Sequence, residues 1–137
     1  MSSLTNHDII RYASEAGIFY FRGVYMRDTL PKSGALAREC GIVNLDSSDG
    51  RGTHWVCYHK YGSNRIYFDS FGQVPPIEIQ KYLKTKREFD IQRNSDIVQH
   101  INSTNCGQLC LFVLEALGRG SSFQTILTTL RQQYGYS

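Results

Sequence analysis

The sequence predicts a small α+β domain, in which helices pack on a mixed or antiparallel sheet. The 137 residues are enough for one domain with a modest core, and 41% of them are hydrophobic. Helical periodicity marks both ends of the chain, whereas the middle is rich in β-type runs and turn residues. The sequence contains no repeat, linker or low-complexity segment, so we expect residues 1–137 to form a single domain.

The first quarter of the chain should hold one helix and one aromatic segment. Apolar residues recur at helical spacing over Thr5–Ala16, and Gly17 is placed to end that helix. The aromatic segment Gly17–Gly23 should be a strand or a packed loop. Residues Arg27–Arg38 should be irregular, because proline and glycine interrupt them.

The middle of the chain should build the sheet. The apolar run Cys40–Leu45 predicts a buried strand, and the polar loop Asp46–Gly52 follows it. Two further β-rich runs, Thr53–Lys60 and Arg65–Ser70, flank the turn signal Tyr61–Asn64 and therefore predict a β-hairpin.

The last part of the chain should return to helices. A Pro-Pro pair at positions 75–76 should open a helix that ends near Leu83. A core helix over Cys106–Leu117 and an amphipathic helix over Ser121–Tyr134 should complete the domain. One or two short strands are expected within Arg87–Gln99, around Phe89–Ile91 and Ile97–Gln99.

The register of the predicted hairpin decides whether it can orient a histidine. If its loop has two or four residues, the numbers of paired residues sum to about 125. Asp69 then lies opposite Val56, and His54 lies diagonally across on the same face, with Cα atoms roughly 7–8 Å apart. At that distance the Asp69 carboxylate can accept a hydrogen bond from one ring nitrogen of His54, and the other nitrogen can take a proton from a thiol. A loop of odd length would place the two side chains on opposite faces.

Cys106 is the strongest candidate nucleophile among the four cysteines. It begins the predicted core helix, and Asn105 precedes it as the expected N-cap. The positive end of the helix dipole favours the thiolate, which is the nucleophilic form. Cys110 lies one helical turn further along, inside the apolar run, and is expected to be a core residue. The spacing of the cysteines does not match a zinc site, and we predict no metal and no other cofactor.

The blocks Gly52–Trp55 and Tyr67–Gly72, together with the six-residue gap between Gln99 and Cys106, resemble the adenovirus-type maturation proteases. This family, called adenain, is related to the ubiquitin-like-protein (SUMO) proteases. Two further segments resemble its N-terminal blocks, namely Tyr20–Tyr25 and Gly41–Asn44. The resemblance implies a circularly permuted, papain-like arrangement in which the catalytic cysteine begins a central helix.

The resemblance also implies a role for each residue of the site. Cys106 would be the nucleophile, His54 the general base and Asp69 the acid that orients it. Gln99 would donate a hydrogen bond to the oxyanion, and losing one such donor typically costs about 10²–10³ in rate. The residues implied to line the substrate cleft are Trp55, Asn44, Gly52, Asn105 and Gly107.

The activity implied by the resemblance is that of a cysteine endopeptidase, a thiol protease. It would cleave precursor proteins of a virus or virus-like element after glycine, at Gly-X-Gly or Gly-Gly sites, during maturation of the capsid. The implied location is the host nucleus or cytoplasm and the virion, and we expect a monomer. No cysteine lies between Cys57 and Cys106, so we expect no covalently joined peptide cofactor. The net charge of +3 leaves weak DNA binding open.

Three alternative functions remain open from the sequence. The first keeps the fold and makes the protein a deubiquitinase or deSUMOylase-type isopeptidase. The second is an acetyltransferase of the same clan, which uses a similar His-acid-Cys set. The third is a capsid-associated binding protein with an idle triad. The N-terminus lacks a signal-peptide pattern, and no apolar run approaches the roughly 20 residues of a membrane span, so we expect an intracellular protein without a membrane segment.

Overall fold

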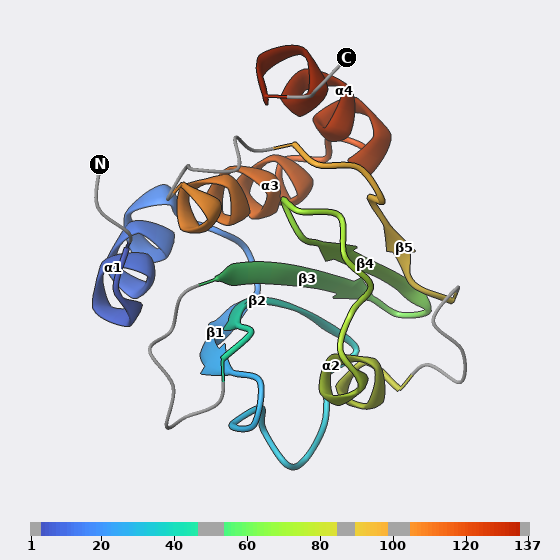
Figure 1. Ribbon diagram of the computed structural model, residues 1–137. Coiled ribbons are helices and arrows are strands. Elements are labelled where there is room, and N and C mark those ends of the chain that lie inside the picture. The colour runs from blue at the N-terminus through green and yellow to red at the C-terminus, as the bar shows by residue number, and fades with distance from the viewer. Residues whose placement is uncertain (1–3, 47–53, 85–89, 99–104, 135–137) are drawn as a thin grey trace.

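The computed structural model describes residues 4–46, 54–84, 90–98 and 105–134, and shows a mixed five-stranded sheet with helices on both faces (Figure 1). This arrangement confirms the predicted α+β class. In chain order the elements are α1 (Asn6–Ala16), β1 (Phe21–Met26), β2 (Arg38–Asn44), β3 (Trp55–Tyr61), β4 (Asn64–Phe68), α2 (Ile77–Tyr82), β5 (Gln92–Arg93), α3 (Cys106–Gly118) and α4 (Phe123–Tyr134). Among the described residues, no helix has the length and apolar character needed to cross a membrane.

The sheet has the strand order β1-β2-β3-β4-β5. The two outer pairs, β1 with β2 and β4 with β5, are parallel, and the central pairs are antiparallel. In the β3–β4 hairpin Tyr61 pairs with Asn64, and Cys57 pairs with Phe68. The loop therefore consists of two residues, Gly62 and Ser63, and the predicted register is confirmed. Gly62 has φ 58°, a left-handed conformation that glycine adopts without strain.

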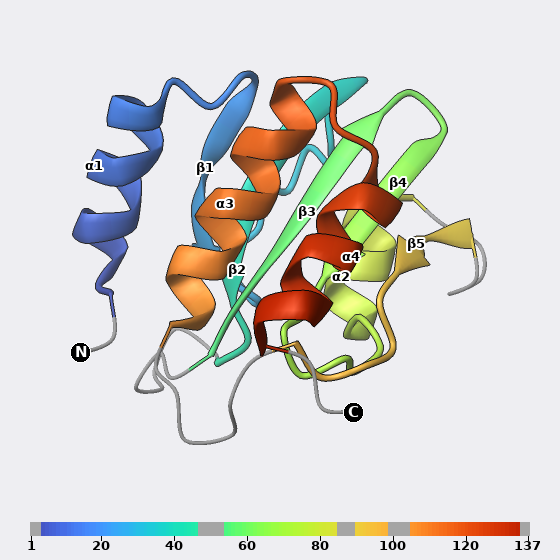
Figure 2. The ribbon, with the colours of Figure 1, turned by 90° about the horizontal axis from the view of Figure 1, so that it is seen from above.

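Alternating side chains of the strands build two cores. Helices α1, α3 and α4 cover one face of the sheet, and α2 covers the other (Figures 1 and 2). In β3, Trp55 and Cys57 pack in the core beneath α3, whereas Val56 and Tyr58 pack with α2. Because side chains alternate along a strand, His54 and Val56, which flank Trp55, are expected to lie on the same face.

The ends of α1 follow from its sequence. The Thr5 hydroxyl accepts a hydrogen bond from the Asp8 N–H at 3.1 Å, and the Asp8 carboxylate accepts one from the Thr5 N–H at 3.0 Å. This capping box starts the helix, and Gly17 ends it with φ 65°. The predicted first helix is thus confirmed. Its buried residues Ile9 and Ala13 pack toward α3.

The expectation of one or two short strands within Arg87–Gln99 is confirmed by β5, Gln92–Arg93, which begins one residue after the expected Phe89–Ile91. The second expected position is wrong in its described part, because Ile97 and Val98 are not in a strand. The chain then leaves the sheet, because its next hydrogen bonds go to the loop after β4. The Val98 N–H, for example, donates to the Ser70 carbonyl at 2.8 Å. Parts of several predicted elements lie outside the described residues. These parts are residues 47–53, which span most of the polar loop and the start of the hairpin, and Phe89 and Gln99 of the two expected strands.

A buried carboxylate joins β2, β3, α2 and the start of β1. Glu39 is fully buried, and its Oε1 accepts hydrogen bonds from Arg22 at 2.9 Å and from the Leu36 N–H at 2.6 Å. Its Oε2 accepts from the hydroxyls of Tyr58 at 2.5 Å and Tyr82 at 2.7 Å. Burial opposes the charge, but these hydrogen bonds outweigh it and lower the pKa of Glu39. Both carboxylate oxygens are therefore paired on the α2 face.

We predict that Glu39→Gln destabilises the protein by about 2–3 kcal/mol, because it removes the charge that pairs with the partly exposed guanidinium of Arg22 and that accepts hydrogen bonds from two tyrosines. Tyr82→Phe removes one hydroxyl from the same cluster and should cost about 1–2 kcal/mol. Urea unfolding at pH 7 measures both. Because the pKa of Glu39 is lowered by folding, its stabilisation is present above the usual glutamate pKa and is lost as the pH falls. Equal stability of Glu39→Gln and the parent protein would contradict this account of the cluster.

Candidate active site

His54 and Asp69 meet at one end of the β3–β4 hairpin. His54 immediately precedes β3 and Asp69 immediately follows β4, so both lie at the open end of the hairpin. The ring Nε2 of His54 lies 2.7 Å from Oδ1 of Asp69, which is the hydrogen bond that the register predicts. The Asp69 side chain is 1% exposed and that of His54 17%. The carboxylate is therefore shielded from water, and the imidazole is partly accessible.

The turn after β4 holds the Asp69 carboxylate in place. Oδ1 also accepts a hydrogen bond from the Phe71 N–H at 2.8 Å, as in an Asx turn. The Gly72 N–H donates to the Asp69 carbonyl at 2.8 Å and closes the turn. Gly72 has φ 70°, and a Cβ there would lie 2.7 Å from the backbone of Ser95 and Asp96. Glycine is thus required both by the turn and by the segment that packs on it.

Two residues that contact His54 and Asp69 were not identified in the sequence analysis. The ring of Phe71 stacks on His54, with ring centroids 4.7 Å apart and an interplanar angle of 21°. The side chain of Asn94 hydrogen-bonds the backbone of Asp69. An Asx turn at Asp69 is a sequence signal that leads to Phe71, two residues on. No local signal leads to Asn94, because it lies 25 residues from Asp69 along the chain.

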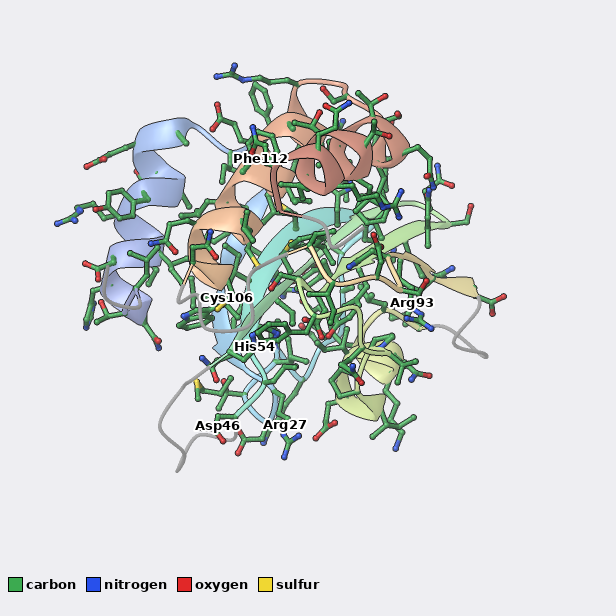
Figure 3. The ribbon with its side chains drawn as sticks, turned by 45° about the horizontal axis from the view of Figure 1, so that its top comes forward. Arg27, Asp46, His54, Arg93, Cys106 and Phe112 are labelled. Atoms are coloured by element: carbon green, nitrogen blue, oxygen red, sulfur yellow. The ribbon has the colours of Figure 1, made fainter. Side chains whose placement is uncertain are left out.

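Cys106 is the first residue of α3 and lies close to His54 (Figure 3). Only 4% of the residue is exposed. Its Sγ lies 3.4 Å from the backbone nitrogen of Trp55, whose N–H donates to it. Interactions with His54 and with the Gly107 N–H also lower the pKa of this thiol. Donors from two elements therefore converge on one thiol at the positive end of a helix.

The pKa shifts of the pair favour a thiolate and an imidazolium. Burial raises the pKa of Cys106, but the hydrogen bonds from His54 and from the Trp55 N–H outweigh it, so that the pKa is lowered. Burial lowers the pKa of His54, but hydrogen bonds to Asp69 and Cys106 raise it to about 9. Both directions stabilise the charged pair at neutral pH.

For two of the other cysteines the pKa shifts in the opposite direction to that of Cys106. Burial raises the pKa of Cys40 to about 12. Burial and the neighbouring Cys57 raise that of Cys110, which packs in the core as predicted. All four cysteines are free thiols. In the described part of the chain, no group of three His, Cys, Asp or Glu side chains is arranged to hold a metal ion.

Three of the residues expected in the substrate cleft, namely Trp55, Gly107 and Asn44, are buried inside the fold. The indole of Trp55 is buried, and its Nε1 donates to the Leu4 carbonyl at 3.2 Å. A Cβ on Gly107 would lie 3.3 Å from the Trp55 ring, so this glycine lets α3 approach β3 closely. The buried Asn44 pairs with Trp55 across the β2–β3 ladder.

Two further expectations concern Asn105 and the residues that the structure does not describe. Asn105 occupies the N-cap position of α3, but its side chain makes no capping hydrogen bond, contrary to the prediction. Its φ of −95° and ψ of 18° differ from the extended conformation of a usual N-cap. Gln99 and Gly52 lie outside the described residues.

The fold that carries this site is similar to that of a solved protease. The crystal structure of ASFV pS273R protease matches with a TM-score of 0.65 at 16% sequence identity, over 99% of this chain and 68% of that chain. The crystal structure of the Se-Met form of that protease gives a TM-score of 0.63 at 17% identity, with the same coverage. No protein-family model matches the chain, and no curated protein matches it by sequence. The resemblance to adenain is carried by the short sequence blocks alone and stays a prediction.

We predict that iodoacetamide alkylates Cys106 faster than Cys40, Cys57 and Cys110 at pH 7, because its pKa is lowered by hydrogen bonds. His54→Ala removes one of these donors and should slow the reaction about tenfold or more at pH 7, with the rate recovering at high pH. Peptide mapping by mass spectrometry assigns the label, and the other three cysteines serve as internal controls. Labelling of Cys106 no faster than Cys40 in the folded protein would contradict the thiolate assignment.

Proposed function

We propose that this protein is a cysteine endopeptidase in which Cys106 is the nucleophile, His54 the acid–base catalyst and Asp69 the residue that orients it. The observation that supports this most strongly is the geometry of the pair. A thiol at a helix N-terminus contacts an imidazole whose second nitrogen is bound to a buried carboxylate. The fold shared with ASFV pS273R protease adds support, since that protein is described as a protease.

In the proposed reaction the Cys106 thiolate attacks the scissile carbonyl carbon. The C=O electron pair moves to oxygen and forms a tetrahedral oxyanion, which hydrogen-bond donors must stabilise. The Cys106 backbone N–H and the Gln99 amide are the proposed donors. As the C–N bond breaks, the imidazolium of His54 donates its proton to the leaving amine, and a thioester on Cys106 remains.

Hydrolysis of the thioester completes the proposed cycle. His54, now neutral, takes a proton from water while the oxygen attacks the thioester carbon. Collapse of this second intermediate releases the carboxylic acid product and restores the Cys106 thiolate. In both steps Asp69 is proposed to orient the imidazole through the hydrogen bond between its Oδ1 and Nε2, which is 2.7 Å long in the structure.

The proposed substrate is a polypeptide with glycine at the cleaved bond. The 4% exposure of Cys106 and the stacking of Phe71 on His54 support a small residue there, since a large side chain would need more space around the sulfur. We further propose that it acts as a monomer on Gly-X-Gly or Gly-Gly sites in viral or virus-like precursors. Particle maturation in the host nucleus, the cytoplasm or the virion is the proposed setting, by the adenain resemblance.

We predict that Cys106→Ala abolishes cleavage of glycine-containing precursor peptides, with a loss of at least about 10⁴ in kcat/KM. Cys110→Ala is the matched control, since it removes a thiol one turn further along α3 and should keep most of the activity. Mass spectrometry of the products measures both rates and locates the cleaved bond. Undiminished cleavage by Cys106→Ala would contradict the proposal. Reaction of the parent only with ubiquitin or SUMO C-terminal probes would instead favour an isopeptidase.

We predict a bell-shaped dependence of kcat/KM on pH. The rate should rise as the pH passes the lowered pKa of Cys106, and fall as it passes the His54 pKa of about 9. Asp69→Asn removes the charge that raises the pKa of His54, so the upper limb should move to lower pH and the maximum should fall about a hundredfold or more. An unchanged upper limb in Asp69→Asn would show that Asp69 does not act on His54.

A further inference from the structure

One buried polar side chain beside the site has no role in the reaction described so far. Asn94 is 2% exposed and lies directly after β5. Its Oδ1 accepts a hydrogen bond from the Asp69 N–H at 3.3 Å, and its Nδ2 donates to the Asp69 carbonyl at 2.6 Å. Nδ2 also donates to the Asp96 carbonyl at 3.2 Å. The amide therefore holds both backbone groups of the residue that orients His54.

The position of Asn94 explains how it reaches Asp69. The parallel β4–β5 ladder pairs Ile66 with Gln92 and Tyr67 with Arg93, and then stops. Beyond that point the chain turns away from the sheet. The Asn94 side chain offers one donor and one acceptor in place of a neighbouring strand, and so continues the pairing onto the first residue after β4.

The Asp69 carboxylate depends on this backbone support. Its Oδ1 takes both the His54 and the Phe71 hydrogen bonds, whereas Oδ2 is buried and has no hydrogen-bond partner among the described residues. Among the described residues, only the hydrogen bonds to Oδ1 restrain the rotation of the carboxylate. The direction of that oxygen therefore depends on how firmly the backbone of Asp69 is held.

We propose that Asn94 is a positioning residue of the active site: by clamping the N–H and C=O of Asp69, it aims the carboxylate at Nε2 of His54. The inference rests on the proposed function for its effect on turnover. Its effect on the charge state of His54 and Cys106 can be measured without any substrate. A merely structural role would predict lower stability with unchanged ionisation of the pair.

The test compares Asn94→Ala with the parent protein by three measurements. NMR titration of the histidines should show the pKa of His54 falling from about 9 toward its usual range. The pH at which iodoacetamide labels Cys106 should rise. With a cleavable peptide, kcat should fall about ten- to a hundredfold while KM changes less than about twofold. Urea unfolding shows whether the variant is folded under the assay conditions.

Two further variants separate positioning from stability. In an Asp69→Asn background, Asn94→Ala should add less than about a twofold loss, because a residue that acts through Asp69 has nothing left to position. Arg131→Gln is the matched control. Arg131 binds Asp96 at 2.6 and 3.0 Å, so this variant releases the same segment from α4 but keeps the amide on Asp69. In Arg131→Gln the pKa of His54 should equal that in the parent protein. If Asn94→Ala does not fold, Asn94→Ser keeps one hydroxyl and should shift His54 in the same direction by less.

The outcomes distinguish the two proposals. A folded Asn94 variant in which His54 titrates as in the parent would overturn the positioning role, and so would a full additional loss in the double variant. An equal shift in Arg131→Gln would assign the effect to the segment rather than to Asn94. If no peptide is cleaved by the parent but the Asn94 variant still shifts the His54 titration, the endopeptidase proposal fails and the positioning role stands.

Discussion

The hydrogen bond between His54 and Asp69 is the interaction on which the rest of the site depends. It joins the two ends of one hairpin, and it exists because the loop between the strands has two residues. The bond leaves one imidazole nitrogen for Cys106 and raises the pKa of the ring, which in turn lowers that of the thiol. Sheet register, a property of backbone pairing, thus sets the ionisation of a cysteine that belongs to a helix.

Distant parts of the chain are needed to hold this bond. In the turn after β4, the Phe71 N–H donates to the Asp69 carboxylate and the Phe71 ring stacks on His54. The side-chain amide of Asn94 donates to the Asp69 carbonyl. Helix α3 can approach because Gly107 leaves room for Trp55, which brings the thiol to the Trp55 N–H. The buried Glu39 cluster pairs its charges on the other face of the sheet. Glu39 and Asp69 thus each accept hydrogen bonds from residues of other elements.

The sequence revealed those parts of the site that local patterns determine. The parity of a short hairpin places His54 and Asp69 on one face, and an apolar run after a polar stretch starts a helix at Cys106. The contribution of Asn94 could not be predicted, because it requires the parallel pairing of β4 with β5, which closes over a long connection. The same pairing explains why the expected strand at Ile97 was wrong: residues after Arg93 bond to the loop that follows β4.

The burial of the charged pair also determines how the protein responds to salt. With Cys106 4% exposed and the His54 side chain 17% exposed, dissolved ions cannot come between the sulfur and the ring. Screening acts mainly on exposed charges, over a Debye length of about 8 Å at physiological ionic strength. The net charge of +3 makes any attraction of this protein to polyanions sensitive to ionic strength. Because the Cys106–His54 pair is largely buried, salt should change the ionisation of the Cys106 thiol much less than it changes interactions of the exposed charges.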